Sequence, residues 1–194
     1  MKTSNLLMAL LSAAGLAMTG GVAAQTTTKD AHDSMYKSAD SQYKMDREAC
    51  NTMSGNAKDI CVEDAKGKEK VAKAEADAAF NNTPKSREAA RIAHADAVYN
   101  VAKEKCDDLA GNAKDVCVKE AKATHVKATA DAHVDRVAAD TRTTSSEKMA
   151  ATRRDASEDK RDADYKVALE KCDALSGAPK DTCVQNAKAR YGKS

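Results

Sequence analysis

Cysteine is the residue type in this sequence whose spacing could do chemistry, because all six cysteines fall into one repeated pattern. Two cysteines with ten residues between them occur three times, as CNTMSGNAKDIC (50–61), CDDLAGNAKDVC (106–117) and CDALSGAPKDTC (172–183). Paired thiols can bind a metal, exchange electrons or close a disulfide. A spacing of ten differs from the close pairs of zinc ribbons and redox Cys-x-x-Cys sites. We therefore expect structural disulfides.

Other residues that could do chemistry give weaker signals. Asp131, His133 and Asp135 are close in sequence, but alternation by two spreads side chains around a helix, which favours a solvated face over a metal site. Scattered methionines suit packing better than copper binding; those beyond residue 24 are Met35, Met45, Met53 and Met149. A phosphate-binding glycine loop, a nucleophile elbow and a His-Glu-x-x-His motif are missing. We predict no enzyme, no catalytic residue, no cofactor and no metal ligand.

The N-terminal segment predicts an oxidising compartment for these cysteines. Lys2 precedes an apolar run from Leu6 to Met18, and Val22-Ala23-Ala24 before Gln25 has the small-x-small form of a secretory cleavage site. We predict that residues 1–24 are a signal peptide cleaved near Ala24. The mature chain is then soluble and exported, without stable membrane insertion, and disulfides persist in an oxidising compartment.

The composition predicts helices with little core. Residues 25–194 contain 34 alanines but only 17 Leu, Ile, Val and Phe residues in total, whereas globular chains usually need at least roughly twice that share. Alanine and long charged residues have high helix propensity. The whole chain has a net charge of +2 and 3% aromatic residues. A nearly balanced charge with few aromatics argues against nucleic acid as a partner.

Glycine, proline and capping residues predict where the helices begin and end. Each repeat carries a glycine suited to a left-handed helix end, at Gly55, Gly111 and Gly177. We expect Asn56 and Asn112 to cap the following helices. Proline at a first helical position is expected at Pro179 and, after Thr83, at Pro84, while Thr144 and Glu147 have capping-box spacing. The predicted helices are 29–53, 57–80, 85–110, 113–140, 145–175 and 179–190.

Cysteines on either side of each predicted turn lie at one level of two antiparallel helices. Cys106 stands five residues before Gly111 and Cys117 six after it. Alanine-lined helices bring such positions within disulfide reach. We therefore predict bridges within each repeat, at Cys50–Cys61, Cys106–Cys117 and Cys172–Cys183, although six cysteines allow fifteen connectivities. Each loop would contribute about 3 kcal/mol by the chain-entropy estimate.

An apolar seam is expected along each cysteine-bearing helix. Tyr43, Tyr99 and Tyr165 stand two helical turns before the first cysteine of their copy. In the second copy the seam contains Ala95, Val98, Ala102, Cys106 and Leu109. The hairpins could stack as a six-helix array or hang as separate hairpins on long exposed helices. The narrow seam and the length of the helices, about 42 Å for 28 residues, favour the elongated form. We predict an all-α fold of three disulfide-closed hairpins, about six helices, in an elongated array with little globular core. Its segments are 25–82, 83–142 and 143–194.

The extended repeat resembles a known group of proteins. The pattern Tyr-x-x-Ala-x-Glu-Lys-Cys-Asp-x-Leu-x-Gly, followed by Lys-Asp-x-Cys-Val-x-x-Ala-Lys, spans residues 99–122 and 165–188. It resembles uncharacterised, signal-bearing, Ala/Lys-rich envelope proteins of Gram-negative bacteria, some labelled TolA-like or cell-envelope biogenesis proteins. The resemblance implies a periplasmic location and no established activity.

Three hypotheses for the function follow. The first is a non-enzymatic periplasmic helical protein with a structural or interaction role in the cell envelope, which meets another envelope protein, a copy of itself or the anionic wall. The alternative is a periplasmic metal-binding or stress-buffering protein that uses histidines, carboxylates or reduced thiols. A third is a small inhibitor of a wall-active enzyme, for which disulfide-closed hairpins are suitable scaffolds.

Overall fold

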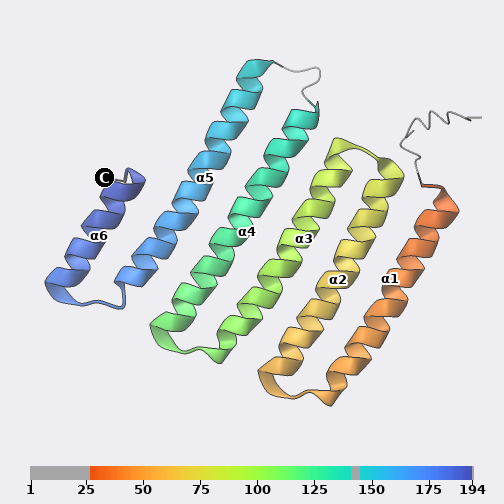
Figure 1. Ribbon diagram of the computed structural model, residues 1–194, viewed down its shortest axis with the longest axis horizontal. Coiled ribbons are helices and arrows are strands. Elements are labelled where there is room, and N and C mark those ends of the chain that lie inside the picture. Colours follow the sequence, from red (N-terminus) through yellow and green to blue (C-terminus); the bar gives the residue numbers. More distant parts are fainter. Residues whose placement is uncertain (1–26, 141–144, 194) are drawn as a thin grey trace, which may run out of the picture.

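The computed structural model describes residues 27–140 and 145–193, which are all helical apart from turns. The predicted signal peptide lies outside these residues. Within them the α-helices, shown in Figure 1, are α1 (Lys29–Ala49), α2 (Gly55–Asn81), α3 (Pro84–Lys105), α4 (Gly111–Asp140), α5 (Ser146–Cys172) and α6 (Gly177–Tyr191). Neither range contains a strand. The predicted all-α class is confirmed.

The helices lie side by side in one antiparallel layer, in chain order from α1 to α6 (Figure 1). Each packs against the helices before and after it. The alternative of hairpins that hang separately is therefore wrong, and the elongated array with little core is confirmed. No described helix is both long enough and apolar enough to span a membrane.

The turns between paired helices differ from the prediction in one respect. Helix α1 ends at Ala49, continues as a short 3-10 helix, Cys50–Thr52, and passes through extended residues Met53 and Ser54. Gly55 is left-handed, with φ of 58°, as are Gly111 and Gly177. However, each of these glycines begins the second helix of its hairpin instead of ending the first. The two extended residues carry the chain across to the partner helix.

The predicted caps are partly confirmed. Thr83 accepts a hydrogen bond from the Ser86 amide, and Pro84 is the first residue of α3. Pro179 is instead the third residue of α6, because that helix begins at Gly177. Asn56 and Asn112 lie inside α2 and α4 and do not cap them, since both helices begin at the preceding glycine. The Thr144 box falls outside the described residues.

Small side chains form the interior. Among the described residues, the buried apolar residues are nine alanines and a valine together with the first cysteine of each pair, and Val137 is the largest of them. Two residues expected in the seam of α3, Val98 and Leu109, are half-exposed, and Met35, Met45 and Met53 are exposed as well. The seam prediction is wrong for these five. In a layer one helix thick, side chains that point out of the layer meet solvent, whatever their polarity.

Candidate functional site

The three disulfides form with the predicted pairing. Cys50–Cys61, Cys106–Cys117 and Cys172–Cys183 have Cα–Cα distances of 5.7, 5.7 and 5.6 Å, which lie within the usual range. The first cysteine of each pair is at most 1% exposed. Half of each bridge is therefore shielded from exogenous thiols, as suits a structural bond.

A hydrogen bond between hairpins recurs in the first two turns. Asn56 Nδ2 at the start of α2 donates to the carbonyl oxygen of Glu104 at the end of α3, at 2.9 Å. One repeat later, Asn112 Nδ2 on α4 donates to the carbonyl of Glu170 on α5, also at 2.9 Å. The third copy has Ala178 at this position and no following helix pair. The asparagine thus occurs where a further hairpin must dock.

A close helix contact lies at the α2–α3 interface, and small residues occupy the equivalent positions of the α4–α5 interface. A Cβ added at Gly67 on α2 would lie 2.8 Å from the Cβ of Ala97 on α3. The copies are offset by 56 and 66 residues, so the equivalent residues of the next interface are Ala123 and Ala163, both buried. Small residues at these positions let the helix backbones approach, which makes the array a tandem repeat of one docking contact.

The residues equivalent to the docking positions are exposed at the two outer edges of the described layer. Ser41 on α1 is equivalent to Ala97 and is exposed, as are its neighbours Lys37, Lys44 and Glu48. On α6 the equivalents of Asn112 and Ala123 are Ala178 and Ala189, which are exposed too. Repeat arrays end in copies with polar outer faces. Within the described residues, the α1 edge therefore has the polar outer face of a terminal repeat, whereas the α6 edge exposes alanines at these positions.

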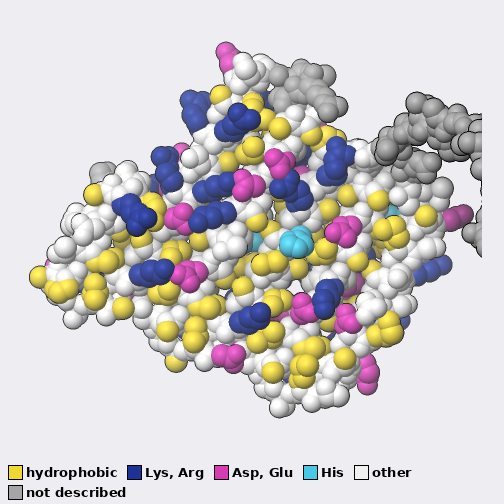
Figure 2. Space-filling view, viewed as in Figure 1, with side chains coloured by type: hydrophobic (Ala, Val, Ile, Leu, Met, Phe, Trp, Pro, Cys, Tyr) yellow, Lys and Arg dark blue, Asp and Glu magenta, His cyan; other side chains and the backbone are white. Residues whose placement is uncertain are grey.

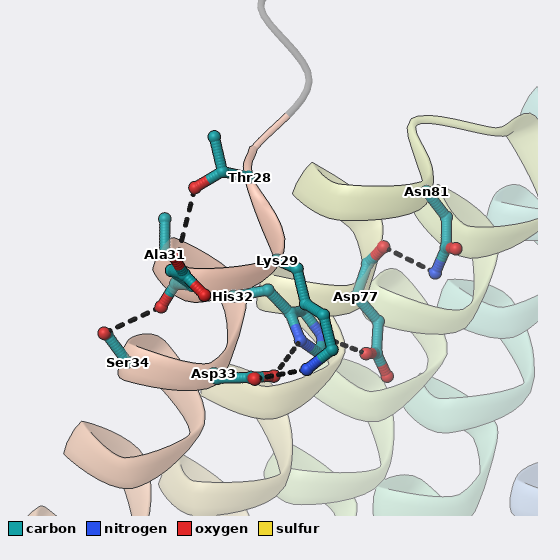
Figure 3. Close-up of polar contacts among 9 residues, drawn as sticks. Thr28, Lys29, Ala31, His32, Asp33, Ser34, Asp77 and Asn81 are labelled. Carbon is teal, nitrogen blue, oxygen red and sulfur yellow. Dashed lines mark hydrogen bonds and ion pairs between the residues drawn. The ribbon is translucent and has the colours of Figure 1, made fainter.

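A histidine–carboxylate pair joins α1 and α2 at the opposite end from their disulfide (Figure 3). His32 Nε2 lies 2.8 Å from Asp77 Oδ1, and the ring also faces Asp33, Tyr36 and Phe80. The hydrogen bond to Asp77 raises the pKa of His32 above its ordinary value. The same bond lowers the pKa of Asp77.

The directions of the two pKa shifts determine how the contribution of this pair to stability depends on pH. A raised pKa of His32 means that its contribution is complete below the ordinary histidine pKa of about 6.5 and is lost as pH rises through the folded value. A lowered pKa of Asp77 means that its contribution is present above about 3.9 and is lost as pH falls through its folded value. The pair therefore stabilises the first hairpin most between these limits.

Two more histidines pair across the second hairpin. His125 on α4 contacts Asp96 on α3, and His133 Nδ1 lies 3.0 Å from Glu88. The other two residues of the Asp131–His133–Asp135 stretch contact different helices: Asp131 pairs with Lys160 of α5, and Asp135 with Arg91 of α3. The stretch is splayed, as predicted.

The repeated tyrosines face the partner helix of their own hairpin. The Tyr99 ring lies 5.2 Å from the His125 ring, and Tyr165 lies 6.0 Å from Tyr191. His125 and Tyr191 are equivalent positions in the second and third copies. The second and third hairpins are thus each joined by an aromatic contact above the disulfide. In the first hairpin Glu69 occupies the position equivalent to His125.

Two grooves between α4 and α5 show that the layer has two different faces. One groove, of about 620 Å³, is lined by Lys119, Lys122 and Lys166, with Asp155 and Asp159 further along. The other is lined by the pairs Glu120–Lys171 and Lys127–Asp164. On α4 the first groove is lined by Lys122, Val126 and Thr129 and the second by Glu120, Thr124 and Lys127. At 3.6 residues per turn these two sets lie on opposite sides of the helix, so the grooves open on opposite sides of the layer. We name these sides the lysine face and the ion-pair face.

Figure 2 looks onto one side of the layer, where charges of opposite sign lie next to one another over α4 and α5. Apolar side chains are scattered between them. On the ion-pair face, the groove between α4 and α5 is followed by a groove between α3 and α4, and the two share Thr124. That second groove shares Val98 with a third groove, which lies between α2 and α3 and is lined by Lys68. Both faces are therefore ridged surfaces without a deep cavity among the grooves described here.

Within residues 27–140 and 145–193, three or more His, Cys, Asp or Glu side chains are nowhere arranged to hold a metal ion. Comparison with known protein families, with curated proteins and with solved structures gave no match. The residues that organise the array and that the sequence did not identify are Asn56, Asn112 and Gly67. Their only signal is the change from Gly-Asn-Ala-Lys to Gly-Ala-Pro-Lys in the last copy.

Proposed function

We propose that this chain is a non-enzymatic periplasmic protein with a structural or protein-interaction role in the cell envelope. The observation that carries the proposal is the repeated docking contact, which joins three disulfide-closed hairpins into one flat layer. Such a layer has two broad exposed faces. It is suited to hold partners on its faces, either another envelope protein or a copy of itself.

The periplasmic location is supported by the cysteines and by the N-terminal sequence. Three disulfides are stable in an oxidising compartment, and residues 1–24 have the pattern of a cleaved signal. The resemblance to signal-bearing envelope proteins points to the same place. These arguments are independent of the fold of the layer.

A non-enzymatic role is supported by the position of the acid and the base whose pKa values are shifted. His32 and Asp77 have shifted pKa values, but they hold α1 and α2 together and line none of the grooves described above. Enzymes place such groups in a cleft that excludes water. We therefore assign this pair to stability.

The test is to express the whole sequence in a Gram-negative host and to fractionate the cells. We expect the oxidised chain in the periplasm, starting near residue 25 by N-terminal sequencing. Photo-reactive side chains at Lys70 and Lys68, on opposite faces of α2, should then give cross-links to an envelope component from one face more than the other. Reduced chain confined to the cytoplasm would contradict the proposal.

Calorimetry distinguishes the metal-binding alternative from the structural role. Copper, zinc and nickel are titrated into the oxidised mature chain. Stoichiometric binding below micromolar concentration would favour that alternative, whereas heats at baseline favour the structural role.

A further inference from the structure

We propose that the lysine face binds an extended anionic polysaccharide. The contacting residues are Lys66 and Lys70 of α2, Lys119 and Lys122 of α4, and Lys166 of α5. We name this set the lysine row. The inference rests on the proposed envelope role and gives it a class of partner.

The lysine row is continuous because its grooves share a residue. Lys122 lines the α4–α5 groove together with Lys119 and Lys166. It also lines a groove that reaches α2, where Lys66 and Lys70 stand. The row therefore crosses α2, α3, α4 and α5, nearly at right angles to their axes. Its length is about 25–30 Å at the usual spacing of packed helices.

The charges of the row are largely free. Among the described residues, no carboxylate lies within 4 Å of Lys70, Lys122 or Lys166, and the nearest oxygen of Glu170 is 3.8 Å from Lys119. Lys66 differs from them, because Glu63 binds it at 2.5 Å. On the ion-pair face of the same helices, Lys68 is bound by Asp64, Lys127 by Asp164 and Lys171 by Glu120, at 2.5 to 2.7 Å. Among the cations that line the described grooves, Lys105 and Arg190 are without a carboxylate partner on the ion-pair face. The unpaired lysines Lys70, Lys122 and Lys166 lie together on the lysine face, which is therefore the more positive of the two in this part of the layer.

The shape and chemistry of the row suit a polymer better than a single ion. Lysine is a flexible point charge that tolerates irregular spacing, whereas a lone phosphate or carboxylate is best bound by the fork of arginine. The three carboxylates that line the α4–α5 groove do not neutralise the lysine row evenly along its length. Asp162 is bound by Lys193, and Asp155 and Asp159 lie one to two turns further along α5.

The grooves between the lysines favour a sugar chain over nucleic acid. Their floors contain Ala97, Ala123, Val126 and Tyr99, so an apolar surface alternates with charge. Lys122 lies over the Tyr99 ring at 5.3 Å, and the ring also packs against His125, so Tyr99 is the one aromatic ring among the residues that line these two grooves, histidines aside. Binding of single-stranded nucleic acid relies on several stacked aromatics, and nucleic acid is not the usual polyanion of a compartment that keeps disulfides.

The test measures binding of fluorescent polygalacturonate to the oxidised mature chain by anisotropy at 50 and 200 mM salt. We expect saturable binding that weakens with salt. Lys70→Gln, Lys122→Gln and Lys166→Gln combined should weaken it about thirty- to a hundred-fold, since each lysine at an anionic surface contributes roughly a factor of three to five. The matched control combines Lys68→Gln, Lys127→Gln and Lys171→Gln. It removes equal charge from the same helices and should change binding less than about three-fold.

Equal losses in the two triple variants would overturn the inference, because they would mean attraction to overall charge. Equal binding of neutral dextran, or tighter binding of single-stranded DNA of matched charge, would overturn it as well. Circular dichroism of both variants checks that the layer is intact. A chain that is periplasmic and cross-links to the envelope but does not bind polygalacturonate refutes this inference alone. A chain that binds it but stays reduced in the cytoplasm refutes the proposed envelope role.

Discussion

Asn112→Ala removes the side-chain hydrogen bond that ties the start of α4 to the end of α5. The donor lies 2.9 Å from the Glu170 carbonyl oxygen. That oxygen also accepts from the Asp173 amide at 3.2 Å, so the substitution leaves no acceptor unpaired. We therefore expect the net value of one hydrogen bond, about 1 kcal/mol, and not the larger cost of a buried orphan. For a chain of this size the unfolding midpoint should fall by about 2–4 °C.

Hydrogen exchange measured by mass spectrometry locates the effect. Asn112→Ala should speed exchange where α4 meets α5, and Asn56→Ala should do so where α2 meets α3. The third repeat supplies the control, because Ala178 occupies the same position beside no further hairpin. Ala178→Asn should leave the free energy of unfolding unchanged within about 0.5 kcal/mol.

Two results would refute this reasoning. Asn112→Ala could leave both the unfolding midpoint and the exchange at α4 and α5 unaltered. Alternatively, Ala178→Asn could shift stability as much as Asn112→Ala does. In either case the hydrogen bond of the asparagine would not be what docks one hairpin on the next.

Three further predictions concern packing, sulfur and protons. Gly67→Ala should destabilise by about 1 kcal/mol, because overpacking against Ala97 costs about 1–3 kcal/mol and exceeds the helix-propensity gain of about 1 kcal/mol; thermal unfolding of the double variant Gly67→Ala/Ala97→Gly should return close to the native midpoint. Replacing Cys106 and Cys117 together by alanine should cost about 3 kcal/mol in urea unfolding, and a loss well under 1 kcal/mol would contradict the structural role of that bridge. His32→Gln should lower the unfolding midpoint more at pH 5.5 than at pH 8.5, since the stabilising proton is lost as pH rises through the raised pKa of this histidine; an equal drop at both pH values would count against the pair.

The sequence predicts the pairing of the cysteines because the relevant contacts are local. Ten residues and a glycine between two cysteines leave room for one tight turn, so the hairpin and its bridge follow from chain geometry. The same is true of Thr83 and Pro84, whose capping partners lie within three residues. Even here the predicted helix ends differ from those of the structure. The sequence pattern does not reveal that Met53 and Ser54 must be extended to reach the partner helix.

The sequence does not predict how the hairpins dock. Asn56 looks like a local cap, and only the tertiary structure shows that it bonds to Glu104, 48 residues away. Alanine occurs on every side of these helices, so the apolar pattern does not identify the two sides of each helix that are covered. Val98 was therefore assigned to the seam, yet it is 47% exposed. The sidedness of the charges also arises only when neighbouring helices bring Lys127 to Asp164 and leave Lys122 free.

Carbodiimide cross-linking tests most directly whether the hairpins form one layer. This reagent joins amines to carboxylates that are in contact, and three such pairs connect the second hairpin to the third: Lys127–Asp164, Lys171–Glu120 and Lys160–Asp131. Peptide mapping of the monomer fraction should recover these links together with Lys73–Asp40 inside the first hairpin. Recovery of the Lys73–Asp40 link without any link between α4 and α5 would contradict the layer.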